Sequence, residues 1–435
     1  MAGMFYVIPD IEKLDLSNFD TSNVEDMSYM FYYDNCLTSL NLKSFNTKNV
    51  KNMENMFGFL IHITEIDLSG FDTSSVTNML SMFSNCNSLK YLDLSNFKTN
   101  NVINLSGIFL ECTSLTSIDV SNFDTSKAQD ISYLFKGCKS LETINLSKFN
   151  TKNAQDMSYM FYGCNSLKEL DLSYFDTENV KYMKSLFYGC TSLTSINLSS
   201  FNTKNVISAD MMFFGCTSLL SLDLSNFDTS NIVEMSYMFS NLNSLKSLDL
   251  KTFNTKNVKH MDYLFAHCSS LTELDVSNFD TSSLESFNFI FGGLTNVKKL
   301  NLENFNTNKI QEMKSLFYND TNLIEINIDS FNTSGIYYMD KMFYGCQKLT
   351  SLDLSHFDTI NVRSMESMFN GCINLRNLNL ISFNTSRCSN FKDMFEQCQD
   401  LEILVDKNKT ANMLANIDMK EIHLVELNEK GDYYF

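Results

Sequence analysis

The stretch "LDLSNFDTSNVEDMSYMF", residues 14–31, decides the fold, because it returns almost unchanged as "LDLSNFDTSNIVEMSYMF" at residues 222–239. The first aliphatic residue of its "LDL" motif recurs every 26 residues without insertion or deletion. These residues are Leu14, Leu40, Ile66, Leu92, Ile118, Ile144, Leu170, Ile196, Leu222, Leu248, Leu274, Leu300, Ile326, Leu352, Leu378 and Leu404. So strict a period predicts a solenoid in which each coil stacks in register on the next.

Each coil is predicted to begin with a short strand. We number a coil from its first aliphatic residue, so that Leu14 has offset 0. Aliphatic residues occupy offsets −3, 0 and +2, as in "LTSIDV" at residues 115–120. The alternation of 0 and +2 is the period of a strand that points these side chains inward and its +1 side chain outward. Strands that recur once per coil would pair in parallel.

A short helix is predicted to follow the strand. All 15 complete coils carry Phe at +5 and Thr at +7, and then apolar residues at +10, +13, +16 and +17, such as Val24, Met27 and Phe31. This spacing fits one face of a helix of about three turns, with N-cap candidates such as Ser22 and a closing glycine such as Gly163. Strands advance about 4.8 Å per coil and helices prefer about 8–10 Å, so the helical side should fan out and curve the solenoid.

The motif "LxxLxLxxF" resembles the leucine-rich repeat, and the longer phrase "SLTSLDLSNFDTS…VxxMxxMFxGC" resembles the BspA-like class of leucine-rich-repeat surface proteins of bacteria and some protists. The resemblance extends over residues 4–405. Phe stands at the usual position of the Asn ladder, and we expect Thr at +7 to cap the loop backbone instead. The expected fold class is an α/β solenoid: a leucine-rich-repeat-like curved right-handed superhelix with a parallel β-sheet on the concave face and short helices on the convex face.

The chain divides into three segments. Residues 1–3, "MAG", are expected to be an added start, because "MFYVI" at residues 4–8 is already in phase with the "MFYGC" of later coils. Residues 4–405 form the solenoid. Residues 406–435 are expected to form a C-terminal cap, with a helix near "TANMLANI" and a strand in "EIHLVEL". We expect a signal or anchor to lie upstream of this chain.

The composition argues against several kinds of partner. The chain carries 33 Lys and Arg against 51 Asp and Glu, a formal charge of −18, and has no basic run. This disfavours nucleic acid and anionic membrane surfaces. No stretch approaches the roughly 18–20 apolar residues that cross a bilayer, so direct membrane insertion is not expected.

The cysteines are predicted to be buried free thiols. Ten of the 12 share offset −6, where other coils carry Leu, and this interchange indicates a small apolar slot. They are Cys86, Cys112, Cys138, Cys164, Cys190, Cys216, Cys268, Cys346, Cys372 and Cys398. Cys388 is expected in the core, and Cys36, which is out of phase, to be the most accessible. The five histidines occupy unrelated offsets and no C-x-x-C or HExxH motif occurs, so we predict no catalytic centre, no metal site and no cofactor.

The +1 column is the most informative outward feature, because it is Asp or Asn in all 15 complete coils. The candidate ligand-binding residues on this face are Asp15, Asp67, Asp93, Asp119, Asp171, Asp223, Asp249, Asp275 and Asp353. One interpretation is a solvated polar ladder, in which Asn separates some of the carboxylates. The other is an acidic, hydroxyl-rich groove for a basic protein segment or a glycan. Calcium is disfavoured, because one carboxylate per coil supplies few of the six to eight oxygens that it takes.

Two further columns have open interpretations. At +6, Asp and Asn alternate over much of the chain, as in Asp20, Asn46 and Asp72. At +18, aromatic residues such as Tyr162 and Tyr188 are predicted either to pack between helices or to form an adhesive convex patch.

The predicted function is a non-enzymatic binding or adhesion module, extracellular or at the cell surface, that recognises a protein or glycan ligand, with host surface or matrix among the candidates. The family resemblance implies this role, and the absence of any single catalytic cluster agrees with it. The alternative is a structural spacer or stalk that displays another domain and has no ligand of its own. The identity of the ligand and the oligomeric state stay open.

Overall fold

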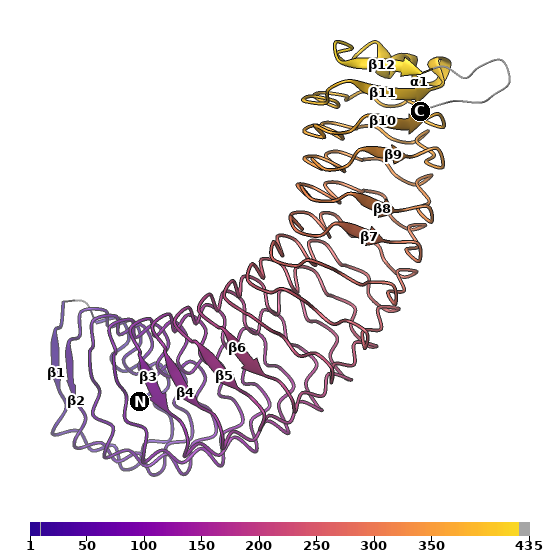
Figure 1. Ribbon diagram of the computed structural model, residues 1–435. Helices are drawn as coiled ribbons and strands as arrows, with labels where there is room; N and C mark the ends of the chain where they lie inside the picture. The colour runs from indigo at the N-terminus through magenta and orange to yellow at the C-terminus, as the bar shows by residue number, and fades with distance from the viewer. Residues whose placement is uncertain (9, 426–435) are drawn as a thin grey trace. The chain divides into compact units, whose positions relative to one another are not determined.

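Each 26-residue repeat forms one coil of a parallel β-solenoid, as the computed structural model shows in Figure 1. The structure describes residues 1–8 and 10–425. The chain divides into two units, Met1–Phe227 and Asp228–Phe435, and each is a stack of coils.

Ten of the 15 complete coils carry a strand where the repeat predicts it, and the strands all pair in parallel. The described coils that begin at Ile66, Leu92, Leu222, Leu248 and Leu274 contain no strand. The first unit contains three two-stranded ladders: β1 (Lys13–Asp15) with β2 (Ser39–Asn41), β3 (Ser117–Asp119) with β4 (Thr143–Asn145), and β5 (Glu169–Asp171) with β6 (Ser195–Asn197). The second unit contains β7 (Lys299–Asn301) with β8 (Glu325–Asn327), and a four-stranded sheet of β9 (Ser351–Asp353), β10 (Asn377–Leu380), β11 (Leu401–Val405) and β12 (Ile422–Val425).

The strand register confirms the predicted inward and outward positions. Leu14 lies opposite Leu40, and Ile118 lies opposite Ile144, so the coils pair one full repeat apart. In β3 the side chain of Ile118 is buried, and those of Ser117 and Asp119 on either side are exposed.

The predicted helices are wrong. The single α-helix among the described residues is α1 (Lys407–Leu414), and it lies after the last complete coil. The segment from +13 to +19 of each coil, here called the turn segment, consists instead of consecutive turns. In the first coil, Met30 and Tyr32 donate their N–H groups three residues back, to the carbonyls of Met27 and Tyr29.

Hydrogen bonds between coils replace the helical ones. In the first coil the N–H groups at +13, +15, +17 and +19 donate to carbonyls of the second coil at distances of 2.8–3.0 Å. These pairs are Met27 to Asn52, Tyr29 to Glu54, Phe31 to Met56 and Tyr33 to Gly58. Because N–H groups at alternate positions point to the next coil, the turn segment forms a second parallel ladder on the side of the coil opposite the strands.

Left-handed backbone conformations make this ladder possible. The residues at +15 and +19 have positive φ in every complete coil, for example 56° at Tyr29 and 67° at Tyr33. A non-glycine residue accepts this conformation at a cost of about 1–2 kcal/mol, so the pairing and packing of the ladder must offset it. Glycines such as Gly163 therefore serve a turn and not the end of a helix.

Because the complete coils contain no helix, the physical reason given for the predicted curvature no longer applies. That prediction required about 8–10 Å between neighbouring elements on the convex side. The turn segments instead pair through backbone hydrogen bonds, as the strands do. The right-handed superhelix and the curvature of the solenoid stay predictions.

A stack of phenylalanine rings fills the interior behind the turn segments. Phe occupies +17 in all 15 complete coils, and each ring lies parallel to the next within its unit. Successive ring centroids are 5.4–6.1 Å apart from Phe5 to Phe213 and 5.3–6.2 Å apart from Phe239 to Phe395. These rings are buried, and their burial supplies a large apolar contribution to each coil interface.

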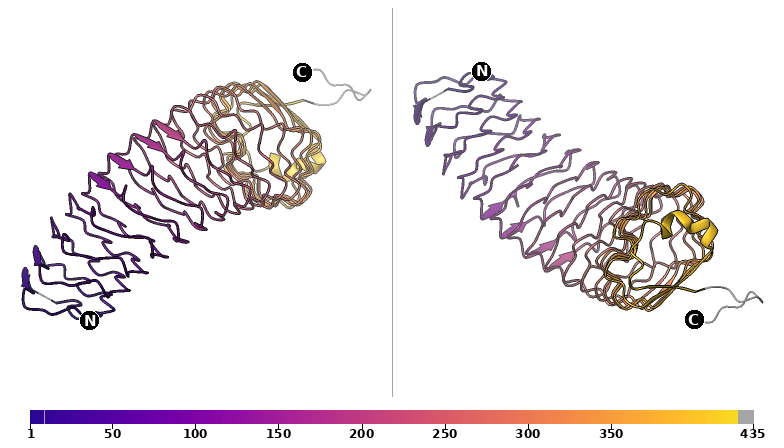
Figure 2. Two further views of the ribbon diagram at one scale, coloured as in Figure 1. Left: turned by 90° about the horizontal axis from the view of Figure 1, so that it is seen from below. Right: turned by 90° about the horizontal axis from the view of Figure 1, so that it is seen from above.

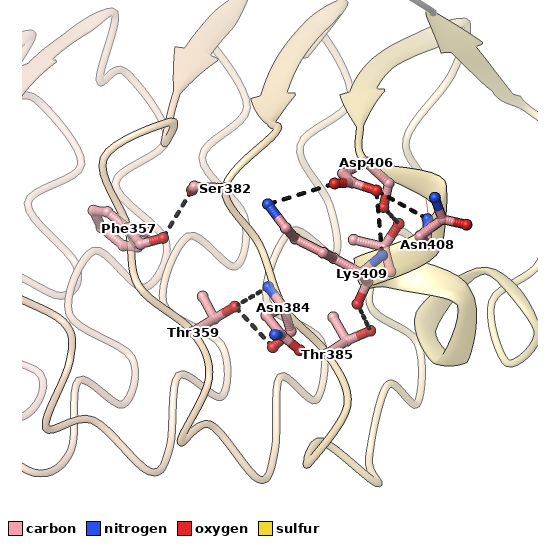
Figure 3. A network of polar contacts seen from close by, with 9 residues as sticks. Phe357, Thr359, Ser382, Asn384, Thr385, Asp406, Asn408 and Lys409 are labelled. Atoms are coloured by element: carbon pink, nitrogen blue, oxygen red, sulfur yellow. Dashed lines mark hydrogen bonds and ion pairs between the residues drawn. The ribbon is translucent and has the colours of Figure 1, made fainter.

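The +7 threonines are buried connectors between coils, as the capping prediction suggested. Thr359 Oγ1 donates to the carbonyl of Asn384 at 3.1 Å and accepts the N–H of the same residue at 2.8 Å (Figure 3). The side chain thus completes the backbone pairing at a corner where two backbones do not meet directly. Amide side chains at other offsets also connect neighbouring coils. For example, Asn122 Nδ2 donates to the carbonyls of Leu94 and Phe97 in the preceding coil.

The last coil of the second unit is covered on two sides. On the strand side β12 pairs with β11. Beside it, α1 lies at the C-terminal end of the stack, as Figure 2 shows. Asp406 caps the N-terminus of α1 by accepting the N–H groups of Asn408 and Lys409, and the carbonyl of Lys409 accepts the Thr385 hydroxyl (Figure 3). The helix and strand predicted for the cap are therefore present, and its residues 426–435, which include the end of "EIHLVEL", lie outside the described residues.

The threonine corner can be tested at Thr177, whose hydroxyl donates to Asn202 O at 2.9 Å and accepts Asn202 N–H at 2.8 Å. Thr177→Val keeps the shape of the side chain and leaves two partly buried backbone groups of Asn202 unpaired. We expect the free energy of unfolding in urea to fall by about 1–3 kcal/mol. The matched control is Thr143→Val on the exposed side of β4, expected to change it by less than about 0.5 kcal/mol. Equal effects of the two substitutions would contradict the connector role.

Candidate functional site

The outward side chains at −1, +1 and +3 form what we call the strand face, and the +1 carboxylates are its most regular feature. All nine candidate aspartates are exposed. In the first unit Asp67, Asp93 and Asp119 lie on three consecutive coils, whereas asparagines separate Asp15 and Asp171 from their nearest aspartates. In the sequence, Asp223 follows Asn197 and precedes Asp249 in this column. In the second unit Asp249 and Asp275 are consecutive, and Asp353 stands apart. Neighbouring carboxylates are spaced by the strand separation of about 4.8 Å.

Every +1 side chain also makes a turn after the strand position of its coil. Its Oδ1 accepts the backbone N–H two residues later, at +3, at distances of 2.8–3.3 Å in all 15 coils. Only Asp and Asn combine a suitable oxygen with this reach, so the turn explains why the column contains nothing else. The sequence analysis missed this role, although the restriction to Asp and Asn two residues before a turn was a usable signal.

These turns hold the carboxylates in place, and at coils such as those of Asp67 and Asp119 they favour the ionised form. Hydrogen bonds from the hydroxyl and backbone N–H of Ser121 lower the pKa of Asp119, and those of Ser69 lower the pKa of Asp67 in the same way. One oxygen of each group is fixed against the backbone and the other is left for solvent or a ligand. The result is a row of preoriented negative charges.

The strand face contains two shallow hollows. In the first unit a hollow of about 350 Å³ is lined by Tyr91, Ser117, Asp119, Thr143 and Asn145. Tyr91 is 66% exposed and presents an aromatic ring beside hydroxyl and carboxylate groups.

The second hollow, in the second unit, has a volume of about 380 Å³. Its lining includes Asp249, Lys251, Glu273, Asp275 and Lys299. Lys251 Nζ lies 3.8 Å from Asp249 Oδ2, so this hollow combines both charges.

The +6 column is a second set of turns. Asp20 Oδ1 accepts the N–H of Ser22 at 2.9 Å, and Asn46 Oδ1 accepts that of Lys48 at 3.2 Å. Asp and Asn can replace each other at this position because both side chains make the same turn. Within the described residues, the geometry of the +6 carboxylates does not distinguish them as a binding surface.

The +18 aromatics stack between coils. The rings of Tyr162 and Tyr188 are 4.4 Å apart and nearly parallel, and Phe214 continues this stack at 4.7 Å from Tyr188. In the second unit Tyr318 and Tyr344 are 4.8 Å apart. Because their faces cover one another, these rings serve mainly to pack the coils together, although without the helices that we had expected.

All 12 cysteines are unpaired, and Cys36 alone is not buried. In the shared column each thiol donates to a phenylalanine carbonyl, as Cys112 Sγ does to Phe83 O at 3.1 Å. Burial raises the pKa of Cys112 and of Cys268 to about 12. The column is therefore a row of inert, hydrogen-bonded core thiols, as predicted.

Two coils place aspartate where the others have cysteine or leucine. The side chains of Asp34 and Asp320 are buried, and the Oδ2 atom of each has no hydrogen-bond partner. Asp320 Oδ1 accepts the N–H of Leu294 at 2.8 Å. Burial raises the pKa of Asp320 well above its ordinary value and that of Asp34 to about 6.

Metal binding finds no geometric support in the part of the chain that the structure describes. Within residues 1–8 and 10–425, no three His, Cys, Asp or Glu side chains lie close enough together to hold a metal ion. His260 and Glu234 approach to 3.8 Å, and His356 contacts the carbonyl of Ile328. No described helix has the length and apolar character needed to cross a membrane.

Comparison with known families identifies the repeat. The model of the family described as "Mycoplasma protein of unknown function, DUF285" matches residues 1–118, 60–169, 103–221, 212–317 and 286–408. The chain therefore belongs to this family. No curated protein matches the chain in sequence.

Solved structures similar to the chain include bacterial leucine-rich-repeat proteins. One, from Bacteroides ovatus, is 17% identical with a TM-score of 0.37, covering 77% of this chain and 93% of its own. A leucine-rich cell surface protein from Faecalibacterium prausnitzii is 16% identical with a TM-score of 0.41, covering 73% and 79%. The functional domain of InlJ from Listeria monocytogenes, which includes a cysteine ladder, is 17% identical with a TM-score of 0.22, covering 90% and 73%.

The buried aspartate predicts an unusual pH dependence. The folded pKa of Asp320 lies above its unfolded value, so its contribution to stability is full below about pH 4 and is lost as the pH rises toward the folded pKa. Asp320→Cys restores the residue of the next coil, and the introduced thiol could donate to Phe291 O. We expect it to raise the free energy of unfolding at pH 8 by about 1–3 kcal/mol. The gain should shrink near pH 4, and a gain that does not depend on pH would contradict this explanation.

The thiol column is tested by labelling with a thiol reagent at pH 8 without reductant. One cysteine, Cys36, should react in the native protein, because the other 11 are buried. All 12 should react after denaturation in urea. A denatured count of two or fewer would show that most cysteines are paired in disulfides.

Proposed function

We propose that this chain is a non-enzymatic binding module, secreted or held at the cell surface, that recognises a protein or glycan through its strand face. The observation that carries the proposal is the row of exposed, preoriented carboxylates at +1, with serines beside most of them. Fixing these side chains before binding lowers the entropy lost when a ligand is held. The surface location rests on the resemblance to BspA-like proteins.

The chemistry of the strand face favours polar ligands. Carboxylates at regular intervals can pair with the cations of a basic protein segment or accept hydrogen bonds from the hydroxyls of a sugar. Tyr91 could provide an apolar surface for a sugar ring in the first hollow. The +1 row repeats one kind of side chain over many coils, which is why we propose binding and not catalysis.

A structural spacer is the second candidate. The turn at each +1 residue accounts for Asp or Asn in that column without any ligand. A spacer would require the regular stack of coils but no ligand-binding surface.

Isosteric substitution separates the two candidates. The triple variant Asp67→Asn, Asp93→Asn and Asp119→Asn removes three consecutive charges and keeps Oδ1 for the turn, as the natural Asn41 and Asn145 do. We expect unchanged stability and at least about a tenfold loss of affinity for a ligand found on an array of matrix proteins and glycans.

The matched control removes three charges from the +6 turns of the same unit, through Asp20→Asn, Asp72→Asn and Asp124→Asn, and should retain binding. Equal affinities of the two triple variants would contradict the strand-face proposal. An array without any bound ligand would favour the spacer.

A further inference from the structure

The last coil leaves one of its hydrogen-bonding edges open. In the coil before it, the N–H groups of Met365, Ser367, Phe369 and Gly371 donate at 2.8–2.9 Å to carbonyls of the last coil. The corresponding donors of the last coil are the N–H groups of Phe391, Asp393, Phe395 and Gln397. None of these four has a hydrogen-bond partner within the described ranges 1–8 and 10–425.

This edge keeps the shape that every other turn segment uses for pairing. The i to i−3 hydrogen bonds of Met394, Glu396 and Cys398 are all made, at 3.0–3.2 Å. Asp393 and Gln397 have φ values of 54° and 67°, like their counterparts in the other coils. The four donors are therefore already oriented for acceptors spaced two residues apart.

The described part of the C-terminal cap, residues 406–425, leaves this side of the coil uncovered. Strand β12 covers β11, and α1 covers the Thr385 corner. A groove of about 530 Å³ remains between residues 391–398 and residues 416–422. Its lining includes Phe395, the last ring of the stack, which is 5.5 Å from Phe369 on one side only.

We propose that this groove binds a segment of a partner protein that continues the turn ladder. The chemistry of the occupant follows from what covers the same edge in the preceding coils: backbone carbonyls at alternate residues and a phenylalanine that stacks on the ring below. The partner segment therefore presents the pattern Met-x-x-Met-Phe. Both charges line the groove, with Lys392 and Lys420 beside the acidic Asp393, Glu396, Asp418 and Glu421, so backbone pairing and the phenylalanine ring are taken to carry the recognition. Pairing of this kind adds a backbone edge to an existing ladder, as strand addition does in a sheet.

Hydrogen exchange on the full chain, resolved to single amides, tests this proposal. In the free protein the four open amides should exchange at least tenfold faster than those of Met365, Ser367, Phe369 and Gly371. The probe is a synthetic peptide, blocked at both ends, with the sequence DMSYMFYG of residues 156–163. At 1 mM it should slow the four open amides at least tenfold. A control peptide with Met160→Ser and Phe161→Ser should leave them fast.

A substitution in the wall of the groove provides a second test. Ile417→Arg should abolish the slowing by the peptide while the exchange of the interior coils stays unchanged. The matched control, Ile373→Arg at an exposed position outside the groove, should retain the slowing.

Four results would overturn the proposal. The parent peptide could leave exchange fast, or 10 mM inorganic phosphate could slow it equally, which would indicate an anion site. The open amides could be slow in the free chain and become fast when the chain ends after Val425, which would make residues 426–435 the occupant. They could also become slow as the protein concentration rises, which would indicate a second copy.

Discussion

Backbone hydrogen bonds between residues one repeat apart are the interaction on which the rest of this structure depends. They occur on the strand side, between residues such as Leu14 and Leu40, and on the turn side, from Phe31 to Met56. Because both sides of a coil pair with the same neighbour, the 26-residue period cannot change without breaking one of the ladders. The left-handed residues, the phenylalanine stack and the buried threonines all accommodate this double pairing.

The +1 side chains of the strand face have both a structural role and a candidate binding role. The carboxylate of Asp119 ends a strand through one oxygen and faces solvent with the other. The geometry thus places rigid hydrogen-bond acceptors at regular intervals. The exposed carboxylate oxygens are the atoms through which this row would bind a ligand. The double role also explains why Asp and Asn interchange freely along the column, because the turn requires Oδ1 and is indifferent to the charge.

The end of a hydrogen-bonded ladder exposes backbone groups that are paired in its interior. Interior coils satisfy their own backbone, and their side chains repeat with little variation. At the last coil of the second unit the described part of the cap pairs with the strand and the threonine corner, and among residues 1–8 and 10–425 no acceptor meets the N–H groups of Phe391, Asp393, Phe395 and Gln397. A repeat protein of this kind can therefore combine a distributed surface along its strands with a localised groove at the end of a stack.

By itself the sequence determined the period, the strands, the inward and outward positions, the buried cysteines and the exposed +1 row, because each follows from a local periodicity. It could not distinguish a helix from a turn ladder, since apolar residues at +13, +16 and +17 suit both. Only the tertiary structure decided between them: the N–H groups of residues such as Tyr29 find their acceptors one coil away, and that pairing holds a φ of 56° that no helix contains. The turn role of the carboxylates and the open edge of the last coil depend in the same way on contacts between coils, which spacing along a single chain does not reveal.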